Sequence, residues 1–319
     1  MRRATAADAM LLTTVTLWAL NFTVSKYILH AGFQPLAYSS VRYVCAALVF
    51  AALTFPREGS LRIRRADFPL VAGAIAVLLA NQLSFVYALH FTSATTVALI
   101  FGTLPIFTAL ISRLVGVERL SRRFWVAAAL SFLGVALVTA GSGGSLSGNL
   151  AGDVLAVVGA ATWGGYAVLI APLMERYSPF RISAVTLLAI CVPLIALGSP
   201  QLARQHFDFH ALVWIGFAFA VLGPLVVTNL LWFTAIDRIG PSRAALFANL
   251  QPFLAAVIAL LLLSEKLTPL ELGGGGVIAA GIVLARGSRA TPTWRLGTAS
   301  PAEAAPQPAA SAVQRCSHG

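Results

Sequence analysis

Charged residues are scarce in this 319-residue chain. Only 10% of its residues are Asp, Glu, Lys or Arg, whereas a soluble domain carries about 25%. Hydrophobic residues make up 58%, and apolar segments of about 20 residues, each long enough to cross a bilayer as a helix, recur along the chain. The composition therefore excludes a soluble domain and predicts an all-α integral membrane protein. We expect ten transmembrane helices, at residues 9–29, 35–55, 68–89, 94–115, 124–141, 154–174, 182–199, 211–235, 242–263 and 270–286.

Carboxylates are missing from the middle of every predicted helix. Asp8 and Asp153 lie at helix starts, where capping and the helix dipole account for them. A membrane-embedded carboxylate is a common proton relay in pumps and transporters, so the chain lacks the residue for that mechanism. It also lacks the cluster of carboxylates and histidines, or the nucleophile with a base, that a membrane-embedded enzyme needs. We therefore expect no enzymatic activity.

Metal and cofactor motifs are equally sparse. Three cysteines are too few and too scattered for a disulfide framework. His206 and His210 have the spacing of metal ligands but no third ligand nearby, and Gly273 to Gly276 lack the strand and lysine of a phosphate-binding loop. We expect no metal and no cofactor.

Basic residues lie in short loops on one side of the predicted membrane. All but four of the 22 Lys and Arg residues fall on the cytoplasmic side if the N-terminus is cytoplasmic; the exceptions are Lys26, Arg42, Arg204 and Lys266. This asymmetry predicts a multi-pass protein of the cytoplasmic membrane with both termini in the cytoplasm. The net charge of +11 is not gathered on one folded domain, so nucleic acid is not an expected partner. The expected partners are the lipid bilayer and a small-molecule substrate, and a homodimer is left open.

The chain contains an internal repeat. Residues 94–138 align without a gap to 241–285 with ten identities, among them Pro105 with Pro252, and nearer the start Trp18 aligns with Trp163. We expect a first repeat at 8–141, a second at 153–286 and a disordered cytoplasmic tail at 287–319, which is rich in Ala, Pro and Ser. Each repeat has five predicted helices, so the second enters the membrane from the opposite side. Inverted repeats of this kind are typical of secondary transporters.

Four stretches carry a family resemblance: "LWALNFTVSKYIL", "SVRYVCAALVF", "YALHFTSATTVALIFGTLPIFTALISRLVGVERLS" and "FTAIDRIGPSRAALFANLQPFLAAVIALLLLSEKLT". Together they resemble the EamA-type transporters of the drug/metabolite transporter superfamily, over about residues 9 to 286. The resemblance implies a ten-helix transporter of the cytoplasmic membrane, often an exporter of amino acids, metabolites or toxic compounds. It does not imply one substrate.

Pro105 and Pro252 interrupt apolar runs that are otherwise helical. A proline inside a helix cannot donate to the carbonyl four residues earlier, here that of Phe101 or Ala248. In lipid, such a carbonyl needs a partner from a neighbouring helix, a hydroxyl or a water. We expect each proline to kink its helix and to shape a polar cavity; the alternative is a kink that serves packing alone.

Polar and aromatic residues within the predicted helices are the candidates for substrate binding, because polar groups in a membrane are costly. The alternatives are hydrogen bonds that only join helices, core packing of the aromatic rings, and extension of the Lys26 and Arg42 side chains to the membrane surface. Lys26 and Arg42 also offer a positive site, in the outer half of the membrane, for the carboxylate of an amino acid or metabolite. The candidates are Asn21, Arg42, Asn81, Gln82, Trp163, Tyr166, Asn229, Trp232, Asn249 and Gln251.

The sequence as a whole predicts a secondary transporter, most simply an exporter, of small organic molecules such as amino acids or other metabolites. It would work by alternating access between the two repeats. The main alternative is import or exchange of an anionic metabolite. A non-transporting membrane sensor and a membrane-embedded enzyme are weaker alternatives, since neither an appended soluble domain nor a catalytic cluster is present in the sequence.

Overall fold

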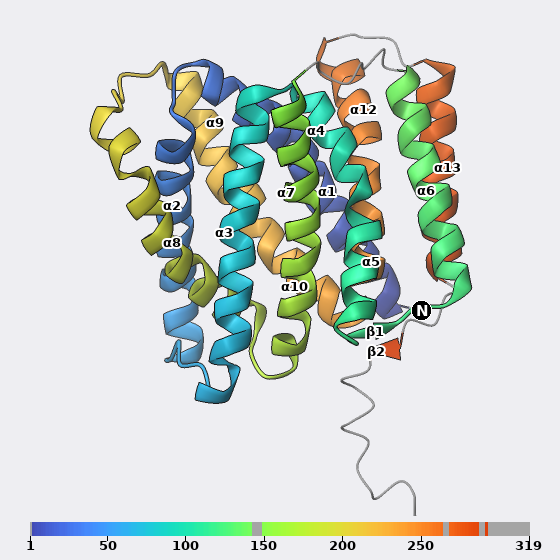
Figure 1. Ribbon diagram of the computed structural model, residues 1–319, viewed down its shortest axis with the longest axis horizontal. Helices are drawn as coiled ribbons and strands as arrows, with labels where there is room; N and C mark the ends of the chain where they lie inside the picture. Colours follow the sequence, from blue (N-terminus) through green and yellow to red (C-terminus); the bar gives the residue numbers. More distant parts are fainter. Residues whose placement is uncertain (1, 142–148, 264–267, 287–290, 293–319) are drawn as a thin grey trace, which may run out of the picture.

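The computed structural model describes residues 2–141, 149–263, 268–286 and 291–292, and these form a bundle of helices (Figure 1). The first repeat consists of α1 (Arg2–His30), α2 (Pro35–Glu58), η1 (Arg65–Asp67), α3 (Phe68–Phe91), α4 (Ala94–Ile100), η2 (Phe101–Thr103), α5 (Leu104–Leu114) and α6 (Arg122–Gly141). The second consists of α7 (Leu150–Ile170), η3 (Ala171–Glu175), α8 (Pro179–Arg204), α9 (Ala211–Val221), η4 (Leu222–Val227), α10 (Thr228–Ile239), α11 (Pro241–Leu246), η5 (Phe247–Leu250), α12 (Gln251–Leu263) and α13 (Pro269–Arg286).

Eight helical segments in the described residues are long and apolar enough to cross a membrane. Residues 269–285 form a shorter apolar helix, and the run that begins at Pro241 ends at Leu263, next to the gap at 264–267. The all-helical membrane architecture is therefore as predicted, whereas the number of ten spans stays a prediction. The eight segments have 19 to 29 residues each, which is long enough to cross a hydrocarbon layer roughly 30 Å thick as a helix.

The predicted tail falls largely outside the described residues, which omit 287–290 and 293–319. Thr291–Pro292 form the short strand β2, which pairs antiparallel with β1 (Glu118–Arg119) between α5 and α6. This contact lies at the end of the bundle where the N-terminus also lies (Figure 1).

Local sequence sets several of the helix starts. Pro35, Pro179 and Pro241 occupy the first turn of α2, α8 and α11, where the missing N–H costs nothing. The Ser93 and Ser178 side chains cap α4 and α8 by accepting from backbone N–H groups. Proline and capping residues therefore place the loops where the sequence predicts them, to within a few residues.

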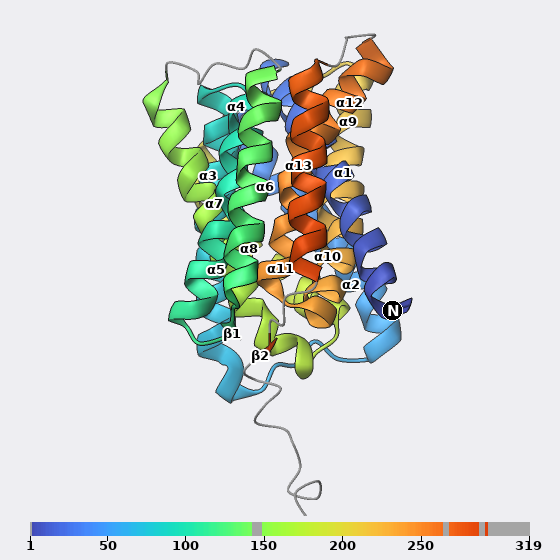
Figure 2. The same cartoon turned by 90° about the vertical axis from the view of Figure 1, so that its right-hand side faces the viewer.

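The packing of helices joins the two repeats throughout. α6 lies beside α13, α2 beside α8, α3 beside α7, and α1 beside α9 and α10 (Figures 1 and 2). Each of these pairs takes one helix from each repeat. The α6–α13 contact depends on small residues: a Cβ added to Gly134 or Gly274 would lie 2.6 to 2.8 Å from atoms of the facing helix. The repeats thus form one interleaved core, not two separate domains.

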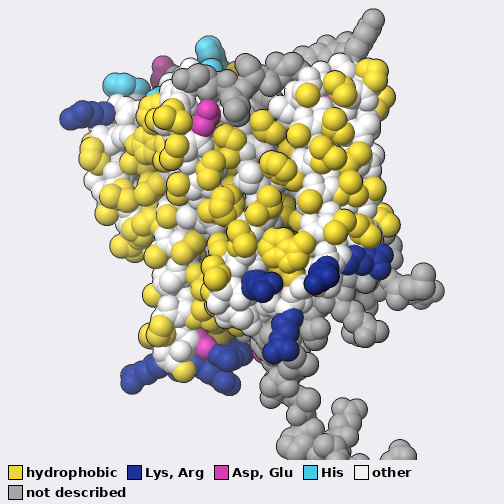
Figure 3. Space-filling model, turned by 45° about the vertical axis from the view of Figure 1, so that its right-hand side comes forward, with side chains coloured by type: hydrophobic (Ala, Val, Ile, Leu, Met, Phe, Trp, Pro, Cys, Tyr) yellow, Lys and Arg dark blue, Asp and Glu magenta, His cyan; other side chains and the backbone are white. Residues whose placement is uncertain are grey.

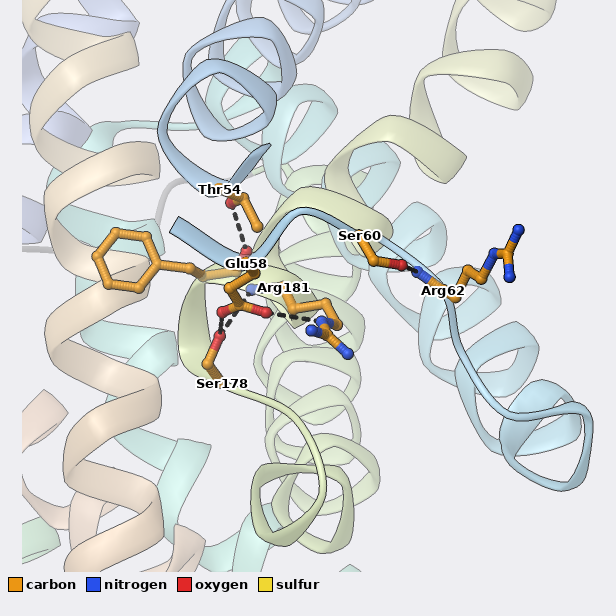
Figure 4. A network of polar contacts seen from close by, with 7 residues as sticks. Thr54, Glu58, Ser60, Arg62, Ser178 and Arg181 are labelled. Carbon is orange, nitrogen blue, oxygen red and sulfur yellow. Dashed lines mark hydrogen bonds and ion pairs between the residues drawn. The ribbon is translucent and has the colours of Figure 1, made fainter. Parts of the chain in front are cut away.

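Arg and Lys side chains gather at one end of the bundle, where the α2–α3, α5–α6 and α7–α8 connections lie, and hydrophobic side chains cover the flank above it (Figure 3). We call this the basic end. Polar contacts join the repeats there. The Glu58 carboxylate at the end of α2 accepts from the Ser178 hydroxyl and, at 2.6 Å, from Arg181 Nε, and the Thr54 hydroxyl donates to the Phe180 carbonyl (Figure 4).

A second carboxylate at the basic end is buried. Glu118 accepts from the backbone N–H of Ser242, at 3.1 Å, and from the Ser242 hydroxyl, whose oxygen also lies 3.3 Å from the Ser112 hydroxyl oxygen. Burial raises the pKa of the Glu118 carboxyl, and the hydrogen bonds from Ser242 and the charge of Arg243 act in the opposite direction. Glu118 therefore holds the start of α11 against the loop that follows α5.

Pro105 and Pro252 each lie in the first turn of a helix, directly after the short 3₁₀ turns η2 and η5. The carbonyls of Phe101 and Ala248 were expected to need partners outside their own segment. They instead accept the backbone N–H groups of Leu104 and Gln251, three residues later. That expectation is wrong, because the tighter 3₁₀ turn restores the hydrogen bond that proline removes.

Candidate functional site

A cavity lies between the repeats. Ten of its lining residues come from the first repeat and four from the second. They are Trp18, Asn21, Phe22, Arg42, Tyr43, Asn81, Gln82, Phe85, Phe101 and Leu104, with Trp163, Pro224, Leu225 and Gln251.

Aromatic rings form most of the apolar wall. Phe22 on α1 contacts Phe85 and Phe101, with ring centroids 5.7 Å apart in both pairs. Trp18 and Trp163 meet edge to face across the two repeats, and the Trp18 indole N–H donates to the Thr228 hydroxyl at 3.1 Å. The wall is therefore built by packing between helices of both repeats and offers flat apolar surfaces to a ligand.

The polar wall is a continuous chain of hydrogen bonds that crosses four helices. Arg42 Nη1 donates to the Tyr38 hydroxyl at 3.2 Å, which donates through Ser25 to Asn21 Oδ1. In the other direction, Arg42 Nη2 donates to Gln82 Oε1 at 3.0 Å. The chain then continues from Gln82 Nε2 to Asn81 Oδ1 and from Asn81 Nδ2 to the Gly159 carbonyl on α7. These polar side chains are thus fixed in position before any ligand arrives.

Arg42 is buried, with 2% of its surface exposed, and does not extend to the membrane surface. Its guanidinium lies near the faces of Tyr38 and Tyr43, with 5.0 and 5.7 Å between Cζ and the ring centroids. Its Nε has no hydrogen-bond partner among the described residues. A charge at the centre of a membrane helix costs roughly 2.5 to 3.5 kcal/mol on insertion scales, so this position is an expensive one for an arginine.

Lys26 differs from Arg42 in its surroundings. Its ammonium donates to the carbonyls of Leu89 and Thr92 at the end of α3, at 2.6 and 2.9 Å, and it does not line the cavity. A cation near the end of a helix interacts favourably with carbonyls of this kind. The structure therefore gives Lys26 a capping contact between α1 and α3.

Six of the ten candidate binding residues line the cavity: Asn21, Arg42, Asn81, Gln82, Trp163 and Gln251. The other four are buried but lie away from its lining. Tyr166 donates to the Thr186 hydroxyl, Asn249 donates to Ser131 on α6, and Trp232 lies behind Trp18 with ring centroids 4.8 Å apart. Asn229 is buried outside the lining as well.

Neither Pro105 nor Pro252 lines the cavity, but residues close to them do. Phe101 lies in η2, and Leu104 and Gln251 directly precede the two prolines. The Gln251 amide forms no side-chain hydrogen bond with the residues that the structure describes. It is therefore the polar group that the second repeat contributes to this site.

Several lining residues have no distinctive sequence signal, namely Phe22, Tyr43, Phe85, Phe101, Leu104 and Leu225. Pro224 does have one, since a Gly-Pro pair interrupts the apolar run at 211–235. The structure places it in η4, a π-helical turn at Leu222–Val227, and such turns are frequent at functional sites. No group of three His, Cys, Asp or Glu residues in the described part of the chain could hold a metal ion.

The comparisons with known proteins agree with this architecture. The model of the EamA-like transporter family matches residues 5–140 and again 150–287. Among related proteins, the Bacillus subtilis "Uncharacterized transporter YyaM" is 29% identical over 252 residues, which cover 75% of this chain and 80% of the relative. A Streptantibioticus cattleyicolor protein named "Probable terminal-alkyne amino-acid exporter" is 27% identical over 290 residues, or 89% and 94% of the two chains.

A solved structure, titled "Crystal structure of protein", has the same fold. It superposes with a TM-score of 0.72 over 92% of this chain and 99% of its own, at 17% sequence identity. At that identity the likeness concerns the fold alone.

Proposed function

The chain belongs to the EamA-like transporter family, and from this premise we propose that it is a secondary transporter that exports small organic molecules across the cytoplasmic membrane. Amino acids or other metabolites are the substrate classes that we favour. One observation carries the proposal: the cavity between the repeats is lined by residues of both, so a movement of one repeat against the other would change access to it.

The topology that goes with this function has ten spans. In it, the run from Pro241 to Leu263 and helix α13 are the ninth and tenth. The repeats, at 8–141 and 153–286, have opposite orientations in the membrane. The basic end faces the cytoplasm, in accord with the preference of Arg and Lys for that side.

Substrate binding in this proposal uses the six candidates that line the cavity. Asn21, Arg42, Asn81 and Gln82 provide the polar wall on the first repeat. Trp163 and Gln251 face them from the second. Of the remaining candidates, Tyr166 and Trp232 pack against Trp163 from behind, whereas Asn229 and Asn249 are buried away from the lining.

Export is favoured over import by the relative whose name describes an amino-acid exporter. Import or exchange of an anionic metabolite is the second candidate, and the buried Arg42 guanidinium is the observation that favours it. The two differ in the direction of net flux and not in the site that they use.

Flux measurements test the proposal. The full chain is reconstituted in liposomes, and uptake of labelled amino acids and organic acids is followed with and without a proton gradient. Flux above that of empty liposomes is expected, and inside-out vesicles should take up the substrate if transport is export. Trp163→Ala should lower flux strongly, whereas Trp125→Ala, on α6 outside the cavity lining, should not. Absence of flux for every compound would reject the proposal.

A further inference from the structure

The cavity contains one formally charged side chain among the described residues, that of Arg42. Described residues accept hydrogen bonds from Nη1 and Nη2, while Nε has no acceptor. A guanidinium has five N–H donors, so more than half of its capacity is unused. Arg42 forms no ion pair with a residue that the structure describes. A buried cation of this kind is stabilised when a ligand supplies a negative charge.

The amide oxygens nearest Arg42 each already accept one hydrogen bond. Gln82 Oε1 accepts from Arg42, Asn81 Oδ1 accepts from Gln82, and Asn21 Oδ1 accepts from Ser25. No carboxylate in the described part of the chain lines the cavity. A ligand ammonium would therefore meet only neutral acceptors there, such as the Gln251 amide oxygen. It would also lie close to a guanidinium in a medium of low dielectric constant, where like charges repel strongly.

The rest of the wall favours hydrocarbon. Phe22, Phe85, Phe101, Trp18 and Trp163 line the cavity as aromatic rings. Guanidinium groups bind carboxylates through pairs of parallel N–H donors, and aromatic walls bind flat or branched apolar groups. The cavity therefore matches a molecule that has one negative end and one apolar end.

We infer that the transported molecule is an apolar monocarboxylate without an ammonium group, which places its carboxylate on Arg42 and its hydrocarbon part between the aromatic rings. The inference rests on the proposed function, because it names the substrate class of the same cavity. Within the metabolites considered above it selects organic acids over zwitterionic amino acids, whose ammonium group would find no carboxylate among the described lining residues.

Binding of four related compounds tests the inference without any mutation. The purified full chain is titrated with 3-phenylpropionate, L-phenylalanine, L-phenylalaninamide and phenethylamine, and binding is followed by tryptophan fluorescence, since Trp18 and Trp163 line the cavity. All four have a phenyl ring. 3-Phenylpropionate is an anion, L-phenylalanine is a zwitterion, and the other two are cations. We expect 3-phenylpropionate to bind about 10- to 100-fold more tightly than phenethylamine, with phenylalanine in between. Equal affinities, or tightest binding of phenylalanine or of either cation, would overturn the inference.

Variants of Arg42 give a second test. Arg42→Gln should abolish the preference for 3-phenylpropionate over phenethylamine, and Arg42→Lys should retain part of it, because the charge remains but the paired donors are lost. Arg57→Gln is the matched control: Arg57 is an exposed arginine on the same helix that contacts Phe180 at the basic end. A folded Arg42→Gln protein that keeps the wild-type preference would contradict the inference. If that variant does not fold, the relative affinities of the four compounds for the wild-type protein still test the inference.

Flux measured with the same four compounds separates this inference from the proposed function. Selective binding of 3-phenylpropionate without any flux in liposomes would reject transport and leave the binding site intact. Flux that treats the four compounds alike would reject the inference and leave transport intact.

Discussion

Trp18 and Trp163 contact each other edge to face, with ring centroids 5.3 Å apart and an angle of 86° between the rings. The two residues occupy equivalent positions in the repeats, so each repeat contributes the same side chain to the wall of the cavity. Such an arrangement follows when two copies of one fold pack around a shared axis. The contact therefore marks the place where the two repeats meet beside the cavity.

The tryptophan pair should show energetic coupling. In a double-mutant cycle of Trp18→Ala and Trp163→Ala, we expect a coupling of about 0.5 to 1.5 kcal/mol in the free energy of unfolding, the value typical of an aromatic pair. The measurement is denaturant unfolding in detergent micelles. A cycle of Trp18→Ala with Trp125→Ala is the control, since no ring contact joins those residues, and it should be additive. Additivity of the first cycle would contradict the prediction.

Neighbouring glycines of α13 should respond differently to alanine. A Cβ on Gly274 would lie 2.7 Å from backbone atoms of Gly134 and Val138, whereas a Cβ on Gly273 would meet nothing within 4 Å. We expect Gly274→Ala to lose about 1 to 3 kcal/mol, because α6 and α13 must move apart. Gly273→Ala should be neutral or slightly stabilising, because alanine favours helix. The measurement is the melting temperature of each variant. Equal melting temperatures would show that Gly274 is not needed for the packing of α6 against α13.

Loss of the Arg181 side chain should destabilise the basic end. Arg181→Gln removes the ion pair with Glu58 (Figure 4), and we expect a loss of about 1.5 to 3 kcal/mol, the range for hydrogen bonds to charged groups. Arg62→Gln is the control, because the one hydrogen bond of Arg62 in that network is made by its backbone N–H. A melting temperature of Arg181→Gln equal to that of Arg62→Gln would show that the pair is too exposed to contribute.

Glu118 should make stability depend on pH. Burial raises the pKa of its carboxyl in the folded chain above the reference value of 4.5. A carboxyl with a raised folded pKa contributes stability at low pH, and this contribution is lost as the pH rises through the folded pKa. The side chain introduced by Glu118→Gln stays neutral and can still accept from Ser242. The melting temperature of the variant should therefore increase relative to that of the wild type as the pH rises. We would compare the two proteins from about pH 4 to about pH 8; parallel curves would contradict the prediction.

Much of the fold can be predicted from the sequence, because long apolar runs, separated by prolines and glycines, identify membrane helices directly. Arg42, Asn81 and Gln82 could be found in the same way, since a polar group within such a run must have a partner or a role. The partner residues Tyr38 and Ser25 could not be found. Their side chains are ordinary in an amphipathic or buried helix, and only the packing of α1 against α2 brings them together.

Four candidate residues lie outside the cavity lining, and all four belong to the second repeat. Helical periodicity places residues relative to one another but does not say which face turns toward the cavity. In addition, the π turn η4 contains Pro224 and Leu225, which line the cavity. A π turn adds one residue, which shifts the following positions by about 100° around the helix axis. Asn229 and Trp232 follow this turn, so a regular helical period drawn through residues 211–235 does not give the direction of their side chains.

The hydrogen-bond chain at the cavity bears on how the protein is made. Asn81 and its acceptor, the Gly159 carbonyl, are 78 residues apart, so at about 5 to 20 residues per second the ribosome needs roughly 4 to 16 s to supply the second after the first. During that interval the first repeat must place its polar groups in the membrane alone. Asn21, Ser25, Tyr38, Arg42, Gln82 and Asn81 already hydrogen-bond to one another within that repeat. Within this chain of hydrogen bonds, only the bond from Asn81 to Gly159 waits for the second half, so the nascent first half can pair most of these polar groups before its counterpart exists.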